Sequence, residues 1–165
     1  MYSVGEFVVK PNTGICKIDE IVMMSLGGSE EKPYYVLIPI DNEKSKIFVS
    51  ADADRKRLRL AMTKEEAAAF LDEVPAMQEI SVPSDKLREQ QYKEAFRTNE
   101  AKELVGVIKH LYARTKKRIA IGKKITSTDE RYYRQAEKAL YSELAFSLGT
   151  EFSEIQKKIM EMIEA

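Results

Sequence analysis

Over the first sixty residues, apolar and polar positions alternate with a period near two, which predicts short β-strands separated by turns. The segment 34–40 is aromatic and β-branched throughout, and Pro39 within it predicts an edge strand or the end of a strand. A Gly-rich segment, 26–33, is expected to form a hairpin loop. Strands are expected at 7–10, 15–24, 34–40, 45–50 and 58–62. So many short strands in so few residues predict a small, strongly bent β-sheet or barrel.

At Thr63 the period changes from two to 3.6, which predicts a helix entered through a capping box of Thr63 and Glu66. Thr98 or Asn99 is expected to cap a later helix, residues 127–130 form a second predicted capping box, and Gly149 is a predicted helix stop. Further helices are expected at 84–97, 99–115, 128–148 and 151–164. The chain therefore reads as α+β: a β module at 1–63, a connecting helix and linker at 64–83, and an all-α helical domain at 84–165.

Charge is distributed unevenly, although 27 basic and 27 acidic side chains balance over the 165 residues. Residues 1–63 are neutral, 64–83 carry a net −4, and 126–165 carry a net −3. Residues 84–125 hold twelve basic and five acidic side chains, a net +7. An excess of this size favours a surface that meets phosphates or an acidic partner.

The cations expected to bind nucleic acid lie in the basic segment and at the start of the following helix. Those on the 84–97 helix can share one face, because Lys93 and Arg97 lie one turn apart. Favourable interaction with a helix dipole, or simple solvation, is the alternative explanation for the cations after residue 113. The predicted nucleic-acid-binding residues are Lys86, Arg88, Lys93, Arg97, Arg114, Lys116, Lys117, Arg118, Lys123, Lys124 and Arg131.

Groups for catalysis or metal binding are scarce. The chain has one cysteine, Cys16, and one histidine, His110, so it cannot form a thiolate zinc cluster or an internal disulfide. Cys16 is expected to be a small buried hydrophobe, and His110 a surface or boundary residue. No catalytic residue, metal, cofactor or small-molecule substrate is predicted. The absence of a signal peptide and of a long apolar run favours a cytoplasmic protein without a membrane partner.

Met24 and Phe48 are ordinary core residues in the simplest interpretation of their strands. Either side chain, if exposed near a sheet edge, would instead indicate a protein partner.

Several short runs, in order along nearly the whole chain, resemble the CarD/CdnL family of bacterial transcription regulators. Residues 4–14 read Val-Gly-Glu-Phe-Val-Val-Lys-Pro-Asn-Thr-Gly, similar to the start of that family. The other similar runs are Tyr34-Tyr35-Val36-Leu37, Glu65-Glu66-Ala67, Gln91-Tyr92-Lys93, Leu111-Tyr112-Ala113-Arg114 and 139–145.

The resemblance implies a Tudor-like N-terminal module that binds the RNA polymerase β subunit, and a helical module that contacts promoter DNA to stabilise the open complex. It places Met24 and Phe48 where polymerase-contacting arginines are expected. It places Arg88 where many members have a tryptophan that wedges into the minor groove. Lys93 and Arg131 match basic positions of the family.

Three functions follow from these observations. The first is a non-enzymatic transcription regulator that binds polymerase and, largely independently of sequence, promoter DNA. The second is a polymerase- or protein-binding adaptor without productive DNA contact. The third is an enzyme with a helical lid, which would need a polar cleft with converging carboxylates.

Overall fold

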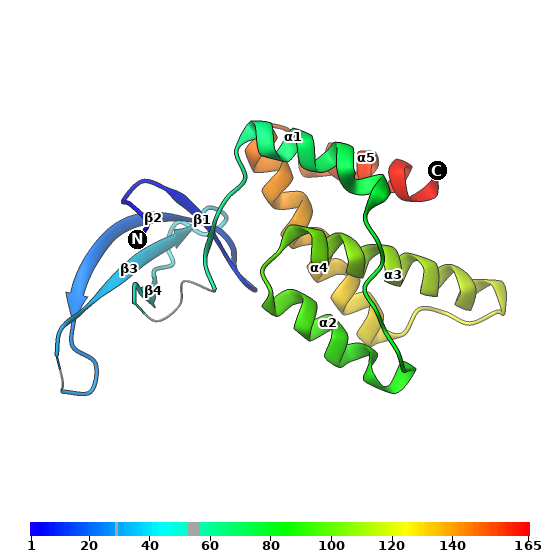
Figure 1. Cartoon of the computed structure of the whole chain (residues 1–165), viewed down its shortest axis with the longest axis horizontal. Helices are drawn as coiled ribbons and strands as arrows, with labels where there is room; N and C mark the ends of the chain where they lie inside the picture. The colour runs from blue at the N-terminus through cyan, green and yellow to red at the C-terminus, as the bar shows by residue number, and fades with distance from the viewer. Residues whose placement is uncertain (29, 53–56) are drawn as a thin grey trace. The chain divides into compact units, whose positions relative to one another are not determined.

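The chain divides into two compact units, Met1–Ala61 and Met62–Ala165. The computed structural model in Figure 1 describes residues 1–28, 30–52 and 57–165. Ser29, in the predicted hairpin loop, lies outside the described residues. The N-terminal unit is an antiparallel sheet and the C-terminal unit is helical, so the predicted α+β fold is confirmed.

The sheet contains five strands in the order β4-β3-β2-β1-β5, with neighbours antiparallel. Pro39 ends β3, which lies inside the sheet, so the strand-end prediction for this proline is correct and the edge-strand prediction is wrong. A β-bulge between Ile18 and Glu20 shifts the register of β2 against β3. The strands are β1 Phe7–Lys10, β2 Gly14–Met24, β3 Lys32–Pro39, β4 Ile47–Ser50 and β5 Arg59–Leu60.

One face of the sheet carries the core of the N-terminal unit. Tyr2 closes this core, because its hydroxyl donates to the carbonyl of Leu58 at 2.9 Å and its backbone N–H donates to the hydroxyl of Tyr35 at 2.9 Å. The buried side chains are Val8, Cys16, Ile18, Tyr35, Leu37, Ala51 and Leu58. Cys16 is fully buried there as predicted, and burial raises the pKa of its thiol to about 11, which leaves it unreactive.

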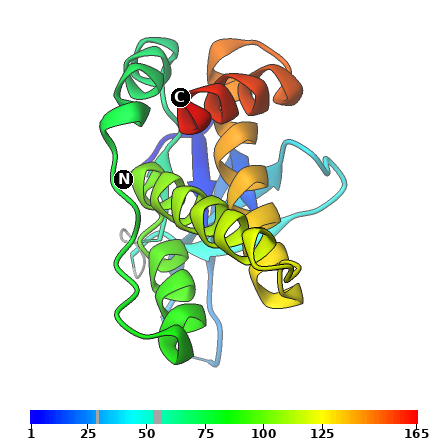
Figure 2. The ribbon, with the colours of Figure 1, turned by 90° about the vertical axis from the view of Figure 1, so that its right-hand side faces the viewer.

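Five α-helices form the C-terminal unit, among the residues that the structure describes. The longest, α4, packs against each of the other four, and α3 crosses it (Figures 1 and 2). The fully buried side chains Tyr92, Ile108, Leu140 and Ile155 come from four different helices, so one core serves the unit. The helices are α1 Lys64–Glu73, α2 Arg88–Arg97, α3 Ala101–Ala120, α4 Ser127–Leu148 and α5 Phe152–Glu164, with short 3₁₀ turns η1 Val74–Ala76 and η2 Asp85–Leu87.

Two of the predicted helix ends are present in the structure, and two of the predicted helix starts are not. Both hydrogen bonds of the Thr63–Glu66 capping box are present, and Gly149 ends α4 in the left-handed conformation, as predicted. The other two caps were wrongly predicted. Glu100 precedes α3 without a side-chain cap, while Thr126, rather than Ser127, caps α4 by accepting from the N–H of Asp129 at 3.1 Å. Because Thr126 supplies the cap, the side chain of Asp129 is not needed as a cap and faces the interior.

A strap of residues 77–81 crosses α3 at Gly106. The N–H of Ile80 donates to the carbonyl of Gly106 at 3.3 Å, a contact that needs very close backbone approach. Lys109, one turn further along α3, donates to the carbonyls of Val74 and Met77 at 2.6 Å each and so satisfies the C-terminal end of α1 and η1. The strap is therefore attached to α3 at two successive turns.

Replacing Gly106 with alanine is expected to lower the unfolding free energy of the helical unit by about 1–2 kcal/mol, because overpacking outweighs the better helix propensity of alanine. The added Cβ would lie 2.8 Å from Cγ2 of Ile80 and 3.2 Å from the carbonyl of Gln78. Urea denaturation measures the effect, with Lys102→Ala, exposed on the same helix, as the control. A stabilised Gly106→Ala protein would contradict this account of the strap.

Candidate nucleic-acid and protein interfaces

Met24 and Phe48 lie on the same, outer face of the sheet, on strands β2 and β4 with β3 between them. In the strand register, Phe48 pairs with Val36, and Met24 lies two register rows away, opposite Lys32. Since side chains alternate between the faces of a strand, both residues point away from the core. Val22 and Tyr34 lie in the row between them. Val36, opposite Phe48, is only 1% exposed, and Glu20 shares its row. We define the outer sheet face as Val22, Met24, Tyr34 and Phe48.

Phe48 is the most exposed member of this face. It lies on β4, an edge strand, with half of its side chain exposed to solvent, whereas Met24 is half-buried. The simplest interpretation, that both are core residues, is therefore wrong for Phe48. An exposed aromatic side chain on an edge strand is a feature of surfaces that bind another protein.

Two of the predicted DNA-binding arginines are engaged inside the helical unit. Asp129, at the start of α4, is only 1% exposed and accepts from Nε of Arg114 at 2.7 Å and from Nε of Arg88 at 3.1 Å. The buried hydroxyl of Tyr92 donates to the same carboxylate at 3.1 Å. Asp85 forms ion pairs with both arginines from the outer side. We call this group the Asp129 cluster.

The Asp129 cluster is electrostatically stable because its charges are paired. Burial acts to raise the pKa of Asp129, but hydrogen bonds from Arg114 and Arg88 outweigh it and hold this pKa below its usual value. Burial and the neighbouring carboxylate also raise the pKa of Tyr92, which keeps the phenol protonated. The cluster joins α2, α3 and α4, so Arg88 and Arg114 have a structural task besides any contact with DNA.

The cations on α2 and early α4 are exposed but paired with neighbouring carboxylates. Lys93 and Arg131 share Glu89, at 3.8 and 3.1 Å, and Arg97 lies 3.3 Å from Glu94. Exposed pairs of this kind are weak, and a phosphate can compete for the cation. Lys86 is exposed and forms no ion pair among the described residues.

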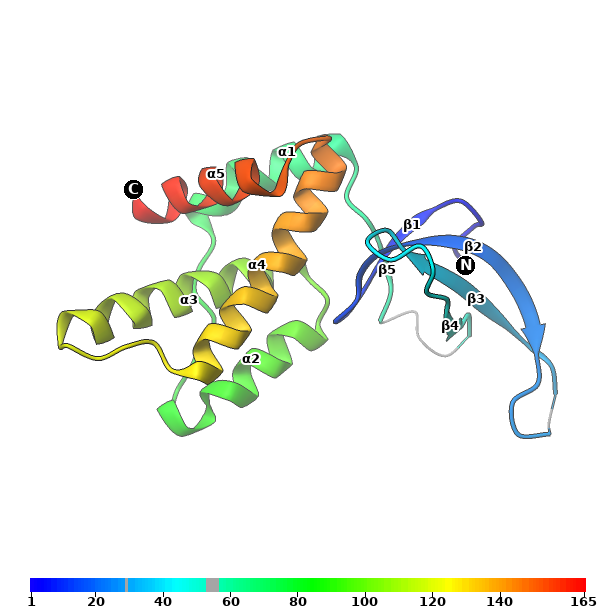
Figure 3. The same cartoon turned by 180° about the vertical axis from the view of Figure 1, so that it is seen from behind.

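The remaining five predicted cations gather where α3 ends and the chain returns to α4. The sequence contains no acidic residue between Glu103 and Asp129. Figures 1 and 3 show this end of α3, with its returning loop, extending beyond the other helices of the unit. We call residues 116–124 the basic tip; its cations are Lys116, Lys117, Arg118, Lys123 and Lys124. Within the described part of the chain, none of the five forms an ion pair with a carboxylate.

Sequence reasoning placed the end of this helix too early. A helix ending near residue 115 was expected, with a basic loop after it, whereas α3 continues to Ala120. The helix ends in a Schellman motif: the N–H of Lys123 donates to the carbonyl of Arg118 at 2.8 Å, and the N–H of Gly122 donates to that of Ile119 at 3.0 Å. Gly122 adopts φ 78°, the left-handed conformation that the motif needs. The cations are thus presented on a fixed scaffold.

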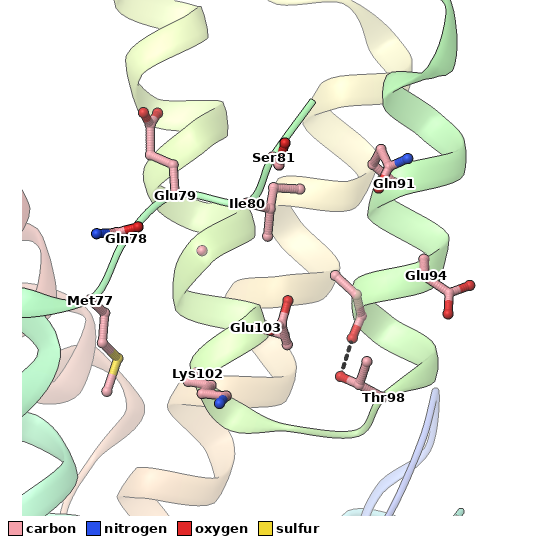
Figure 4. Close-up of a pocket in the computed structure, with 12 residues that line it drawn as sticks. Met77, Gln78, Glu79, Ile80, Ser81, Gln91, Glu94, Thr98, Lys102 and Glu103 are labelled. Carbon is pink, nitrogen blue, oxygen red and sulfur yellow. Dashed lines mark hydrogen bonds between the residues drawn. The ribbon is translucent and has the colours of Figure 1, made fainter. Parts of the chain in front are cut away.

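A groove of about 480 Å³ lies beside the strap, between α2 and α3 (Figure 4). Its carboxylates come from Glu79, Glu94 and Glu103, and its apolar wall includes Ala95 and Gly106. In Figure 4 the three carboxylates are spread around the groove and do not converge on one point. Within the described ranges, no group of three or more His, Cys, Asp and Glu side chains is placed to hold a metal ion.

His110 lies at the boundary of the core, as expected, half-buried on α3. Its Nε2 is buried without a hydrogen-bond partner among the described residues, and its ring lies 5.9 Å from that of Tyr92. Burial lowers the pKa of this histidine, an effect that nearby Glu79 opposes. The imidazole therefore favours its neutral form.

The N-terminal unit matches a known protein family. Residues 2–61 match the family described as CarD-like/TRCF RID domain, and the match ends where the N-terminal unit ends. The N-terminal unit belongs to the CarD-like/TRCF RID domain family. Domains of this family are Tudor-like, act without catalysis and bind the RNA polymerase β subunit. No curated protein matches the chain at a significant level.

The RID domain confirms the predicted family and the Tudor-like fold of the N-terminal module. The match covers residues 2–61 and supports a transcription-related protein of the CarD-like kind. The matched range does not include the helical unit, so the contacts of that unit with DNA stay a prediction. Among the described residues, no helix combines the length and the apolar content needed to cross a bilayer.

Two features of these surfaces escaped sequence reasoning. Asp129 lies within the stretch predicted as a capping box and was given no role of its own; its place between two arginines depends on how three helices cross. Ile119 and Ile121, in the basic tip, are exposed although their apolar character suggests burial. The signal for them was available, because they interrupt a run of cations at the end of a helical stripe.

Proposed function

We propose that this protein is a non-enzymatic transcription regulator that binds the RNA polymerase β subunit through its RID domain and contacts promoter DNA through its helical unit. Contacts made only with the open complex would raise the population of that complex, with each 1.4 kcal/mol or so worth a factor of about ten. The protein would act in the bacterial cytoplasm, where polymerase and promoter DNA are found.

The outer sheet face is the proposed polymerase contact. An exposed aromatic residue on an edge strand, on the same sheet face as half-buried Met24 and Tyr34, would supply the apolar anchor that protein interfaces commonly use. Family membership carries this half of the proposal, since RID domains bind the β subunit. Phe48 and Met24 are the residues proposed to make the contact.

The basic tip is the principal proposed DNA contact. Its five cations have no competing carboxylate among the described residues, so they can meet phosphates without first breaking an ion pair. Lys86, Lys93, Arg97 and Arg131 would add weaker contacts around it. Arg88 and Arg114 would contribute mainly through the Asp129 cluster, by fixing the helices that carry the others. Such contacts position DNA and do not read bases.

A polymerase-binding adaptor without DNA contact is the second candidate. The observation that favours it is the internal pairing of Arg88 and Arg114 with Asp129 and Asp85. A gel shift on forked promoter DNA beside a polymerase pull-down distinguishes the two functions. Binding to polymerase alone would favour the adaptor, whereas binding to both, with DNA affinity falling steeply as salt rises, supports the regulator.

Replacing Phe48 with aspartate is expected to weaken polymerase binding by at least tenfold, because it replaces the proposed apolar anchor with a charge. Pull-down of polymerase core enzyme by the full chain measures the effect. Leu60→Asp is the matched control: Leu60 lies on the opposite edge strand and is 48% exposed, against 50% for Phe48. Equal loss in both variants would place the interface elsewhere.

A further inference from the structure

The groove beside the strap carries negative charge that its own walls do not neutralise. Three carboxylates and one ammonium group line it, and within the described residues Glu79 and Glu103 form no ion pair. Glu94 pairs with exposed Arg97, and a pair of this kind is weak. The groove therefore offers acceptors for further cations beside apolar side chains, which are Met77, Ile80 and Ala95 (Figure 4).

The basic tip presents the complementary side chains. Lys117 and Ile121 lie about one turn apart, on the same side of α3, and Ile121 is 68% exposed. Lys117 follows Gly106, which lines the groove, by eleven residues, or about three helical turns. The cation and the isoleucine therefore lie on the side of α3 that borders the groove.

The tip cannot reach the groove of its own chain. Glu103 and Lys117 are fourteen residues apart on one continuous helix, which is about 21 Å along its axis. This distance exceeds the combined reach of a glutamate and a lysine side chain. Two copies whose α3 helices run antiparallel remove the separation, because each then sets its tip opposite the groove of the other. Such a pair is a closed two-fold dimer in which the same contact forms twice.

The charge of the whole chain favours a second copy as the occupant of the groove. The 27 basic and 27 acidic side chains leave no net charge to keep copies apart. The charges are nevertheless separated, with unpaired cations at the tip and unpaired carboxylates in the groove. A second copy supplies one tip for each groove, so both needs are met in equal number.

We propose that two copies of this chain associate reciprocally, with the basic tip of each in the groove of the other. Lys117 pairs with Glu103, and Ile121 packs against the apolar wall. The contact is small and charged, so it forms at high protein concentration and weakens as salt rises. It goes beyond the proposed DNA contact and competes with it, because Lys117 cannot hold a carboxylate and a phosphate at the same time.

Sedimentation equilibrium of the full chain, up to about 1 mM protein and at low and high salt, tests the pairing. The weight-average mass is expected to rise from 18.9 kDa towards twice that value, and to rise less at high salt. Glu103→Lys and Lys117→Glu should each weaken association at least tenfold, since either places like charges at both contacts of the dimer. The matched control is Lys157→Glu, the same change in charge at an exposed position of α5, which should associate like the wild type.

An equimolar mixture of Glu103→Lys and Lys117→Glu is the decisive measurement. In a mixed dimer each contact again joins a positive and a negative side chain, so the mixture should recover the wild-type association although neither variant pairs with itself.

Four results would overturn the proposal. They are a wild-type chain that stays monomeric to about 1 mM, groove and tip variants that associate like the wild type, a mixture without recovery, and growth beyond the dimer. An equal loss in Lys157→Glu would assign the association to net charge and overturn it as well. The DNA contact is judged separately by the gel shift, so it can stand if the pairing fails.

Discussion

Replacing Asp129 with alanine is expected to lower the unfolding free energy of the helical unit by about 3 kcal/mol, the lower end of the cost of breaking a buried ion pair. The variant leaves Arg88 and Arg114 without their shared carboxylate and removes the acceptor of the Tyr92 hydroxyl. The lower end applies because both arginines keep roughly a fifth of their side-chain surface exposed and can partly rehydrate.

Urea denaturation of the full chain, followed by helical circular dichroism, measures this loss. Asp85→Ala is the matched control, because Asp85 contacts the same two arginines but is 67% exposed, so its pairs should contribute less than about 1 kcal/mol. A cost for Asp129→Ala no greater than that for Asp85→Ala would show that the cluster does not hold the three helices together.

The same variant should also change how stability depends on pH. Since the folded state holds the pKa of Asp129 below its unfolded value, the stabilisation from this group is fully present above the unfolded pKa, about 3.9. It is lost as pH falls from there through the folded pKa. Stability of the wild-type unit should therefore fall more steeply than that of Asp129→Ala below about pH 4. Parallel pH profiles would contradict this assignment.

The fold was predicted correctly where the sequence signal depends on neighbouring residues only. The Thr63 capping box and Gly149 were predicted correctly, because their chemistry is satisfied within one turn of helix. The strands were located to within a few residues for the same reason. The end of α3 was misplaced because helix propensity continues through Lys116–Ala120, and only the φ of Gly122 stops it.

The composition of the two candidate surfaces could not be predicted from neighbouring residues. Alternation in β2 is broken by the bulge after Ile18, so period alone could not place Met24 and Phe48 on one face. The sequence prediction treated Arg88 and Arg114 like the other cations, although these two are the ones that pair with Asp129 among the described residues. That difference depends on contacts between residues far apart in the chain. Composition therefore predicted a basic surface, and the structure separates its paired members from its unpaired ones.

Neutralising the basic tip should produce the largest change in DNA binding. Replacing Lys116, Lys117, Arg118, Lys123 and Lys124 with glutamine removes up to five phosphate contacts, so affinity at physiological salt should fall roughly 100- to 1,000-fold. The slope of log affinity against log salt should become shallower by up to about 4.5, because each lost contact removes about 0.9 from it. Fluorescence anisotropy on a labelled promoter duplex, repeated at several salt concentrations, measures both quantities.

The control variant replaces Lys93, Arg97 and Arg131 with glutamine. These cations are exposed, like the four lysines of the tip, but are paired with Glu89 and Glu94. Their loss should therefore change affinity by less than about tenfold. Polymerase binding should survive both sets of substitutions, since it is assigned to the RID domain. Equal losses in the two variants would mean that DNA meets a broad basic surface and that pairing does not decide which cations act. No loss in either would leave the adaptor function, because a net charge of +7 in residues 84–125 would then serve something other than DNA.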